Sequence, residues 1–164
     1  YESCLVLSHF KGHAMAGFGG AIKNSAIGFA APQGKSLIHS GGKSRTNAWG
    51  GPQDPFLEAM AEAGKSISDA FDDGKRVVYI NVMNRLSVDC DCNGNPAEPD
   101  MHDISVLAST DALALDQACI DLVYAVPDSQ DLVTRIESRN GLHTLAHAET
   151  IGLGSRSYRL VDLG

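Results

Sequence analysis

The chain has 164 residues, a formal net charge of -7, 43% hydrophobic residues and 20% charged residues. This length predicts a single domain over residues 1–164 with its own core, and the apolar content argues against disorder. The acidic charge argues against a nucleic-acid partner, because nucleic-acid binding needs a basic surface. No apolar run reaches the roughly 18–20 residues of a membrane span, so we expect no membrane partner. A disulfide framework is a poor interpretation of the four cysteines in a chain of this size without secretory features, so we expect a reducing, cytoplasmic location.

The first third of the chain predicts a strand, a turn and a helix. Residues 4–8 (CLVLS) are a continuous apolar run, which predicts a strand buried on both faces of a sheet. The glycine-rich residues 9–20 follow it, as in the turn between a strand and a helix of an α/β protein. Residues 21–31 predict a short helix. Residues 32–52 predict a long irregular segment, and such segments are often functional.

The middle of the chain predicts a long helix and two further strands. Residues 54–73 carry apolar side chains at helical spacing, with proline at the first helical position and glycine after the last. Residues 76–83 (RVVYINVM) are β-branched and aromatic, which predicts a strand that residues 86–88 extend or pair with. A turn-rich loop follows at 90–100, and residues 103–108 predict the next strand.

The last third predicts mainly helices. Residues 109–124 begin with Ser, Thr and Asp, which are good helix N-caps. Two weaker helices follow at 128–139 and 141–150, and residues 158–161 predict a last short strand. Strands that alternate with helices indicate an α/β layered fold with a mainly parallel or mixed sheet flanked by helices.

The glycine-rich turn carries the first candidate site. Histidine, lysine and glycine follow a predicted strand, and open α/β sheets bind ligands at the carboxyl ends of their strands. Glycines let backbone N–H groups approach an anion, and lysine supplies positive charge. The alternative is a surface turn with solvated charges. The residues that we expect to hold an anion or cofactor here are Lys11, Gly19, Gly20, Lys23 and Asn24.

A C-x-C pair in the 90–100 loop is the second candidate. Cys90 and Cys92 are close enough in sequence to bind one soft metal ion, either zinc or iron, or an iron–sulfur centre. Two thiolates do not complete a site, so we expect histidines to join them. The candidates are His9, His13 and His39. The flanking aspartates are expected to raise the thiol pKa values unless a cation binds.

Acidic and histidine pairs elsewhere are less specific. We include Asp103, Asp111 and Asp116 among the candidate anion or cofactor contacts, although Asp111 equally suits a helix N-cap and Asp116 a solvated face. His143 and His147 share a helix face, but HExxH is absent because Thr144 follows the first histidine. A surface pair is the better interpretation of these histidines.

Several segments carry a specific pattern in order, among them HFKGH at 9–13, GFGGAIKN at 17–24 and a segment that ends in CDC at 90–92. Together they resemble the family of unknown function DUF362, whose members are often labelled iron–sulfur proteins. The resemblance implies that this chain is a C-terminal fragment of a longer protein, an interpretation that the absence of an initiator methionine at Tyr1 also favours. Many members carry two four-cysteine clusters that are absent here from residues 41–51. The segments that carry the resemblance are 9–13 (HFKGH), 17–24 (GFGGAIKN), 34–40, 79–92, 103–118 and 151–158.

Three functional hypotheses follow. The leading one is a metal-binding protein of redox or enzymatic type, with a small anionic molecule held beside the metal. The rival is a metal-free anion- or nucleotide-binding module built on the glycine- and lysine-rich turn. The third is a fragment that is inert without an N-terminal half. The sequence leaves open whether the protein partner is a second copy or that missing N-terminal domain.

Overall fold

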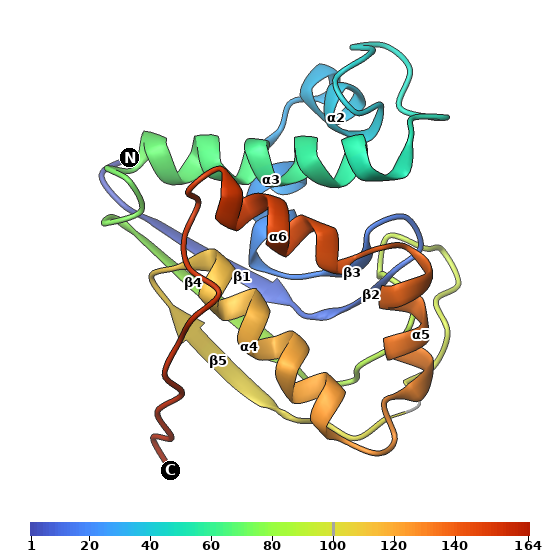
Figure 1. Ribbon diagram of the computed structural model, residues 1–164, viewed down its shortest axis with the longest axis vertical. Coiled ribbons are helices and arrows are strands. Elements are labelled where there is room, and N and C mark those ends of the chain that lie inside the picture. Colours follow the sequence, from blue (N-terminus) through green and yellow to red (C-terminus); the bar gives the residue numbers. More distant parts are fainter. Residues whose placement is uncertain (100) are drawn as a thin grey trace.

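The computed structural model describes residues 1–99 and 101–164, and its centre is a three-stranded mixed sheet (Figure 1). The strands are β1 (Cys4–His9), β4 (Val77–Met83) and β5 (Ser105–Ser109), in the order β1-β4-β5. β1 pairs with β4 in parallel, from Cys4↔Val77 to His9↔Val82. β5 pairs with β4 in antiparallel fashion. The predicted α/β layered fold is therefore confirmed, and its sheet is mixed.

One face of the sheet is covered by helices, with α4 (Ala112–Ala125) lying across it in Figure 1. Alternate strand residues on this face, such as Val6 and Tyr79, are buried. On the opposite face Leu5 and Leu7 are 62% and 60% exposed. The prediction that the first strand is buried on both faces is therefore wrong, because the helices among the described residues pack on one side only.

Two long helices form the next layer. α3 (Gln53–Ala70) packs along α6 (Leu142–Thr150), and α5 (Gln130–Ser138) lies against the hairpin described below (Figure 1). α3 is amphipathic: its buried residues recur at helical spacing, among them Phe56, Leu57 and Met60. The helices predicted over 54–73, 109–124, 128–139 and 141–150 are all present. Among the residues that the structure describes, no helix is both long and apolar enough to cross a membrane.

A short hairpin follows β1 and was not predicted. β2 (Lys11–His13) pairs with β3 (Gly17–Gly19) in antiparallel fashion, in a sheet of its own. Gly17 has φ 82°, a conformation that favours glycine. Residues 86–88, predicted as a strand, form none, but Ser87 accepts a hydrogen bond from the Gly12 N–H at 2.8 Å.

Three further segments differ from their predictions. The helix expected over 21–31 is a single turn, α1 (Ala21–Lys23), that continues as the π-helical turn η1 (Asn24–Gly28). The segment expected to be irregular over 32–52 contains the helix α2 (Pro32–His39), which begins with proline at its first turn. Residues 158–161 form no strand, because side chains of α4 hold the chain beside that helix: Asp121 accepts a hydrogen bond from Tyr158 at 2.8 Å.

Candidate metal centre

The candidate site lies where β1 and β4 end at the same edge of the sheet. The β2–β3 hairpin follows β1, and the C-x-C loop follows β4, so parallel pairing brings the two segments together. Their backbones touch at Gly12, where a Cβ atom would collide with the Val88 carbonyl group. Glycine at position 12 thus allows the C-x-C loop to pack directly on the hairpin.

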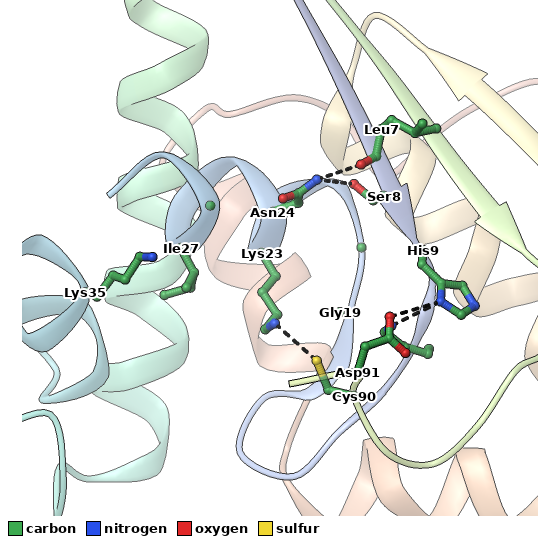
Figure 2. Close-up of a pocket in the computed structure, with 13 residues that line it drawn as sticks. Leu7, Ser8, His9, Gly19, Lys23, Asn24, Ile27, Lys35, Cys90 and Asp91 are labelled. Carbon is green, nitrogen blue, oxygen red and sulfur yellow. Dashed lines mark hydrogen bonds and ion pairs between the residues drawn. The ribbon is translucent and has the colours of Figure 1, made fainter. Parts of the chain in front are cut away.

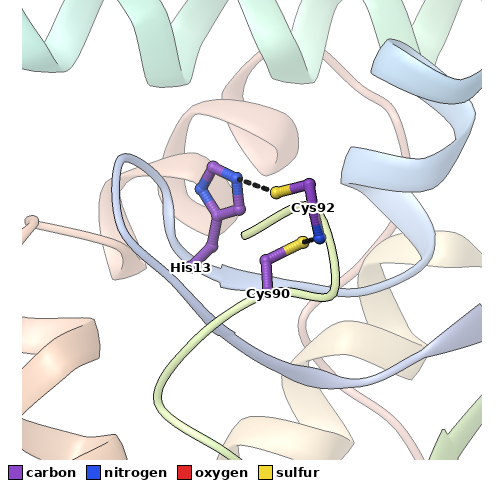
Figure 3. A group of neighbouring side chains, drawn as sticks. All are labelled: His13, Cys90 and Cys92. Carbon is purple, nitrogen blue, oxygen red and sulfur yellow. Dashed lines mark hydrogen bonds between the residues drawn. The ribbon is translucent and has the colours of Figure 1, made fainter. Parts of the chain in front are cut away.

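His13, Cys90 and Cys92 form the one cluster of potential metal ligands found in the described part of the chain (Figure 3). One ligand atom from each residue lies within 4.8 Å of the other two. The Cys92 Sγ atom is 3.8 Å from His13 Nε2. His13 is buried, Cys90 is half-buried and Cys92 is exposed, so the cluster lies between the core and the surface.

The His13 imidazole is held neutral. Burial, together with the nearby charge of Lys23, lowers its pKa to about 3. Its Nδ1 atom accepts hydrogen bonds from the backbone N–H groups of Met15 and Ala16, at 3.2 and 3.0 Å. A neutral imidazole that accepts at Nδ1 carries its proton on Nε2, so in this state an N–H group faces the Cys92 sulfur.

The two thiols differ in their pKa. Burial alone raises the pKa of Cys90, but hydrogen bonds from Cys92 and the positive charges of Lys23 and Lys11 bring it below its ordinary value. Burial and the neighbouring Cys90 raise the pKa of Cys92. Cys90 is therefore the thiol that ionises first.

The expectation that the flanking aspartates raise the thiol pKa values is wrong: the Cys90 pKa is lowered, and burial and Cys90 raise the Cys92 pKa. Asp91 forms an ion pair with the Lys11 ammonium group. Asp89 lies 3.1 Å from an Arg135 guanidinium nitrogen, on α5. Each carboxylate thus has a cation of its own, which reduces its effect on the sulfur atoms.

A cavity of about 340 Å³ opens beside the cluster (Figure 2). Cys90 belongs to its wall, whereas Cys92 and His13 do not line it. The cavity is lined by the end of β1, the start of α1, the π-helical turn and α2. Its other lining residues are Leu7, Ser8, His9, Lys11, Gly19, Gly20, Lys23, Asn24, Ile27, Gly28, Lys35 and Asp91.

Five of the predicted anion or cofactor residues line this cavity, and three do not. Lys11, Gly19, Gly20, Lys23 and Asn24 are in its wall. Asp103 instead accepts a hydrogen bond from the Arg85 N–H at 2.6 Å. Asp111 is the N-cap of α4 and accepts from the Leu113 and Ala114 N–H groups. Asp116 is fully buried below α1.

The structure brings only one of the three candidate histidines to the cysteines. His9 lies in the cavity wall, where Nε2 contacts the Asn84 carbonyl oxygen at 2.6 Å and Nδ1 accepts from Lys11 at 3.1 Å. His39 contacts the Lys35 carbonyl oxygen through Nδ1 at 2.7 Å and stacks on Phe56. Both rings are thus occupied with protein groups outside the cluster.

Two charged residues of the cavity wall were not among the predicted site residues. Lys35 lies on α2, in a segment that was expected to be irregular, and Asp91 was considered only for its charge beside the thiols. Proline at position 32 was the available signal for α2, because it marks helix starts. No comparable signal in the sequence pairs Asp91 with Lys11, since the two are 80 positions apart.

His143 and His147 lie at the contact between α6 and α3, and they are not the surface pair that was predicted. His143 Nε2 lies 2.9 Å from a Glu58 carboxylate oxygen, and His147 Nε2 lies 3.4 Å from one of Glu62. The histidine side chains are 31% and 19% exposed, so both lie mostly within the α3–α6 contact. His143 thus bonds to Glu58 across the α3–α6 contact, whereas the buried His147 Nε2 atom has no hydrogen-bond partner among the described residues.

Comparison with known proteins adds one finding. No curated protein and no solved structure matches the chain. A family model described as domain of unknown function (DUF362) matches residues 1–121, a range that includes the hairpin, the cavity wall and the C-x-C loop. Because the match covers more than half of the chain, the protein belongs to the DUF362 family.

Proposed function

We propose that the protein binds a single transition-metal ion through His13, Cys90 and Cys92, and that this ion has a redox or enzymatic role. The observation that carries the proposal is the convergence of one imidazole and two sulfur atoms within 4.8 Å. These residues come from two segments far apart in the sequence. Soft thiolate and imidazole ligands favour zinc or iron over magnesium or calcium.

The number of ligands supports a reactive ion over a purely structural one. Structural zinc sites are closed by four protein ligands, whereas catalytic sites use three and keep one position for water or substrate. Three ligands are also too few for a usual iron–sulfur cluster, which is held by four cysteines. Cys4 and Cys119 are not part of the cluster, so a mononuclear ion is the better proposal.

The hydrogen bonds of His13 oppose metal binding, but they cost less free energy than a metal ion can supply. For Nε2 to become a ligand, the ring proton must move to Nδ1, and the bonds from Met15 and Ala16 are then lost. Leaving these two backbone N–H groups without an acceptor costs about 1–3 kcal/mol each, or roughly 2–6 kcal/mol together. Zinc binding to structural sites releases roughly 10–16 kcal/mol at neutral pH. Even a site with fewer ligands has enough binding energy to change the tautomer.

Metal analysis of cysteine variants tests the proposal. The protein is purified without oxygen after growth with zinc or iron, and its metal content is measured by mass spectrometry. We expect about one ion per chain in the parent protein and a near-complete loss in a Cys90→Ser/Cys92→Ser variant. Cys4→Ser is the matched control and keeps the metal. Unchanged metal content in the double variant would refute the proposal.

The metal-free anion-binding module is the second candidate. It is favoured by the cavity, which carries three lysines and does not depend on a metal for its shape. A thermal-shift titration with inorganic phosphate separates the two. Stabilisation by phosphate that persists with a chelator, in protein that purifies without metal, would favour this candidate over the first.

A further inference from the structure

The lysines of the cavity are not equivalent. The Lys11 ammonium group is buried and already paired with Asp91, so its charge is compensated within the protein. Lys23 and Lys35 form no ion pair with any carboxylate in the part of the chain that the structure describes. The cavity therefore keeps two lysines that no carboxylate of the described residues neutralises, in a protein whose net charge is -7.

The backbone around Lys23 directs its side chain across the cavity. A Cβ atom at residue 19 would lie 3.2 Å from the Lys23 Cδ atom, so the absence of a side chain there leaves room for the lysine stem. The Lys23 Nζ atom lies 3.9 Å from the Cys90 sulfur (Figure 2). Lys23 thus places its ammonium group between the cavity and the proposed metal ligand.

Asn24 was predicted to contact an anion or cofactor, but its side chain bonds to the protein instead. Its side-chain N–H₂ group donates to the Leu7 carbonyl oxygen at 2.9 Å and lies 3.0 Å from the Ser8 hydroxyl. These contacts fix the π-helical turn against the end of β1. Such turns are frequent at functional sites. Asn24 therefore positions the cavity wall, and Lys23 and Lys35 remain as the groups that can bind a ligand.

We propose that the cavity binds a small organic anion, with its carboxylate or phosphate group between Lys23 and Lys35 and an apolar body against Ile27. Ile27 belongs to the cavity wall, and its side chain lies between the two lysines in Figure 2. The volume of about 340 Å³ lies at the small end of ligand cavities, which span about 300–1,000 Å³. A dinucleotide is too large for it, which narrows the ligand to a compact molecule.

The anion site rests on the proposed function only for the role of the bound anion as a substrate. Cys90 is both a wall residue of the cavity and a ligand in the proposed metal centre. An anion beside Lys23 therefore lies next to the metal-bound thiolate, as the substrate of a metal enzyme would. Binding itself depends on the two lysines and not on the metal.

The experiment is a calorimetric titration at low ionic strength with benzoate, its neutral analogue benzamide and inorganic phosphate. We expect benzoate to bind more tightly than phosphate and benzamide not to bind. Lys23→Gln and Lys35→Gln are each expected to weaken benzoate binding at least tenfold. Lys75→Gln, which removes the same charge from the turn between α3 and β4, outside the cavity wall, is expected to bind as the parent does. Circular dichroism checks that each variant is folded.

Metal content is measured in the same samples, so that the two proposals fail separately. The anion site is supported if the lysine variants keep the metal but no longer bind benzoate. Parent protein that retains no metal after growth with zinc and with iron, yet binds benzoate through Lys23 and Lys35, supports the anion site and refutes the metal centre. The anion site is refuted if benzoate does not bind the metal-loaded parent at millimolar concentration, or if both folded lysine variants bind it with the affinity of the Lys75→Gln control.

Discussion

The carboxylate of Asp116 accepts a hydrogen bond from the backbone N–H of Ala21 at 2.8 Å, although the two residues are 95 positions apart. Its other oxygen accepts from the Ile22 N–H at 2.9 Å, and Asn81 donates a third bond at 2.7 Å. A fully buried carboxylate on α4 thus holds the first turn of α1. Gly20 completes the arrangement, because a Cβ atom there would collide with the Asp116 side chain. The cavity wall is therefore tied to the core through Asp116.

Asp116→Asn is expected to destabilise the protein by about 1–3 kcal/mol at pH 7, because the new amide group presents a donor to a backbone donor.

The variant also tests how the contribution of Asp116 to stability depends on pH. Burial raises the Asp116 pKa to about 6, so the folded state binds more protons than the unfolded state between about pH 4 and 6. The contribution of this group is fully present below pH 4 and is lost as the pH rises through 6. Urea unfolding at pH 4.5 and 7 measures both effects: the penalty of the variant should be larger at pH 4.5. An equal penalty at both pH values would contradict this.

Gly12→Ala is expected to disturb the proposed metal centre without touching its ligands. The added methyl group collides with the Val88 carbonyl group, so the C-x-C loop must move away from the hairpin, at a cost of typically 1–3 kcal/mol. We expect metal affinity to fall at least tenfold in a competition assay with a chromophoric chelator. Gly94→Ala is the control, since position 94 has open space around it. Equal affinities in the two variants would show that the close packing does not position the cysteines.

Asp111 connects α4 to the last segment of the chain. It caps α4 and also accepts a hydrogen bond from the Ser155 N–H at 2.9 Å. Asp111→Ala is therefore expected to cost about 1–2 kcal/mol through the lost cap and to release residues 155–158. Trypsin should then cleave faster after Arg156, whose side chain donates to Gln117 at 2.7 Å in the folded protein. Asp162→Ala, further along the exposed tail, is the control. Cleavage at an unchanged rate in Asp111→Ala would mean that the cap and the tail are independent.

Much of the fold could be predicted because its elements carry strong local patterns. The apolar runs at 4–8 and 76–83 contain the cores of β1 and β4, and the spacing of apolar residues located α3. The hairpin could not be found, because its three-residue strands contain glycine and polar residues without alternation. The exposure of one face of the sheet could not be predicted either, because the sequence does not show whether another element covers an apolar side chain.

The sequence predicted which segments form the candidate site, but not which of their side chains contact each other. Parallel strands that are followed by Lys11 and by Cys90 bring these residues to one edge, which the order of predicted strands already suggested. Which histidine faces the sulfur atoms depends on the hairpin turn, and that turn was not predicted. The separate structural duties of Asp111 and Asp116 were likewise beyond a sequence-based assignment, because each depends on contacts with distant backbone N–H groups.

Metal binding through His13 Nε2 makes a further prediction that does not depend on any activity. Without metal, Nδ1 accepts from the N–H groups of Met15 and Ala16. When zinc binds Nε2, Nδ1 takes up the proton, and these two N–H groups lose their acceptor. The ¹⁵N shift of His13 Nδ1 should change to that of a protonated nitrogen, and amide hydrogen exchange at Met15 and Ala16 should become faster. The Gly12 amide, bonded to Ser87 at 2.8 Å, is the internal control. The Cys90→Ser/Cys92→Ser variant should show neither change, because the ion is not retained. Stoichiometric zinc binding with His13 Nδ1 still an acceptor would show that the cysteines bind the metal without this histidine.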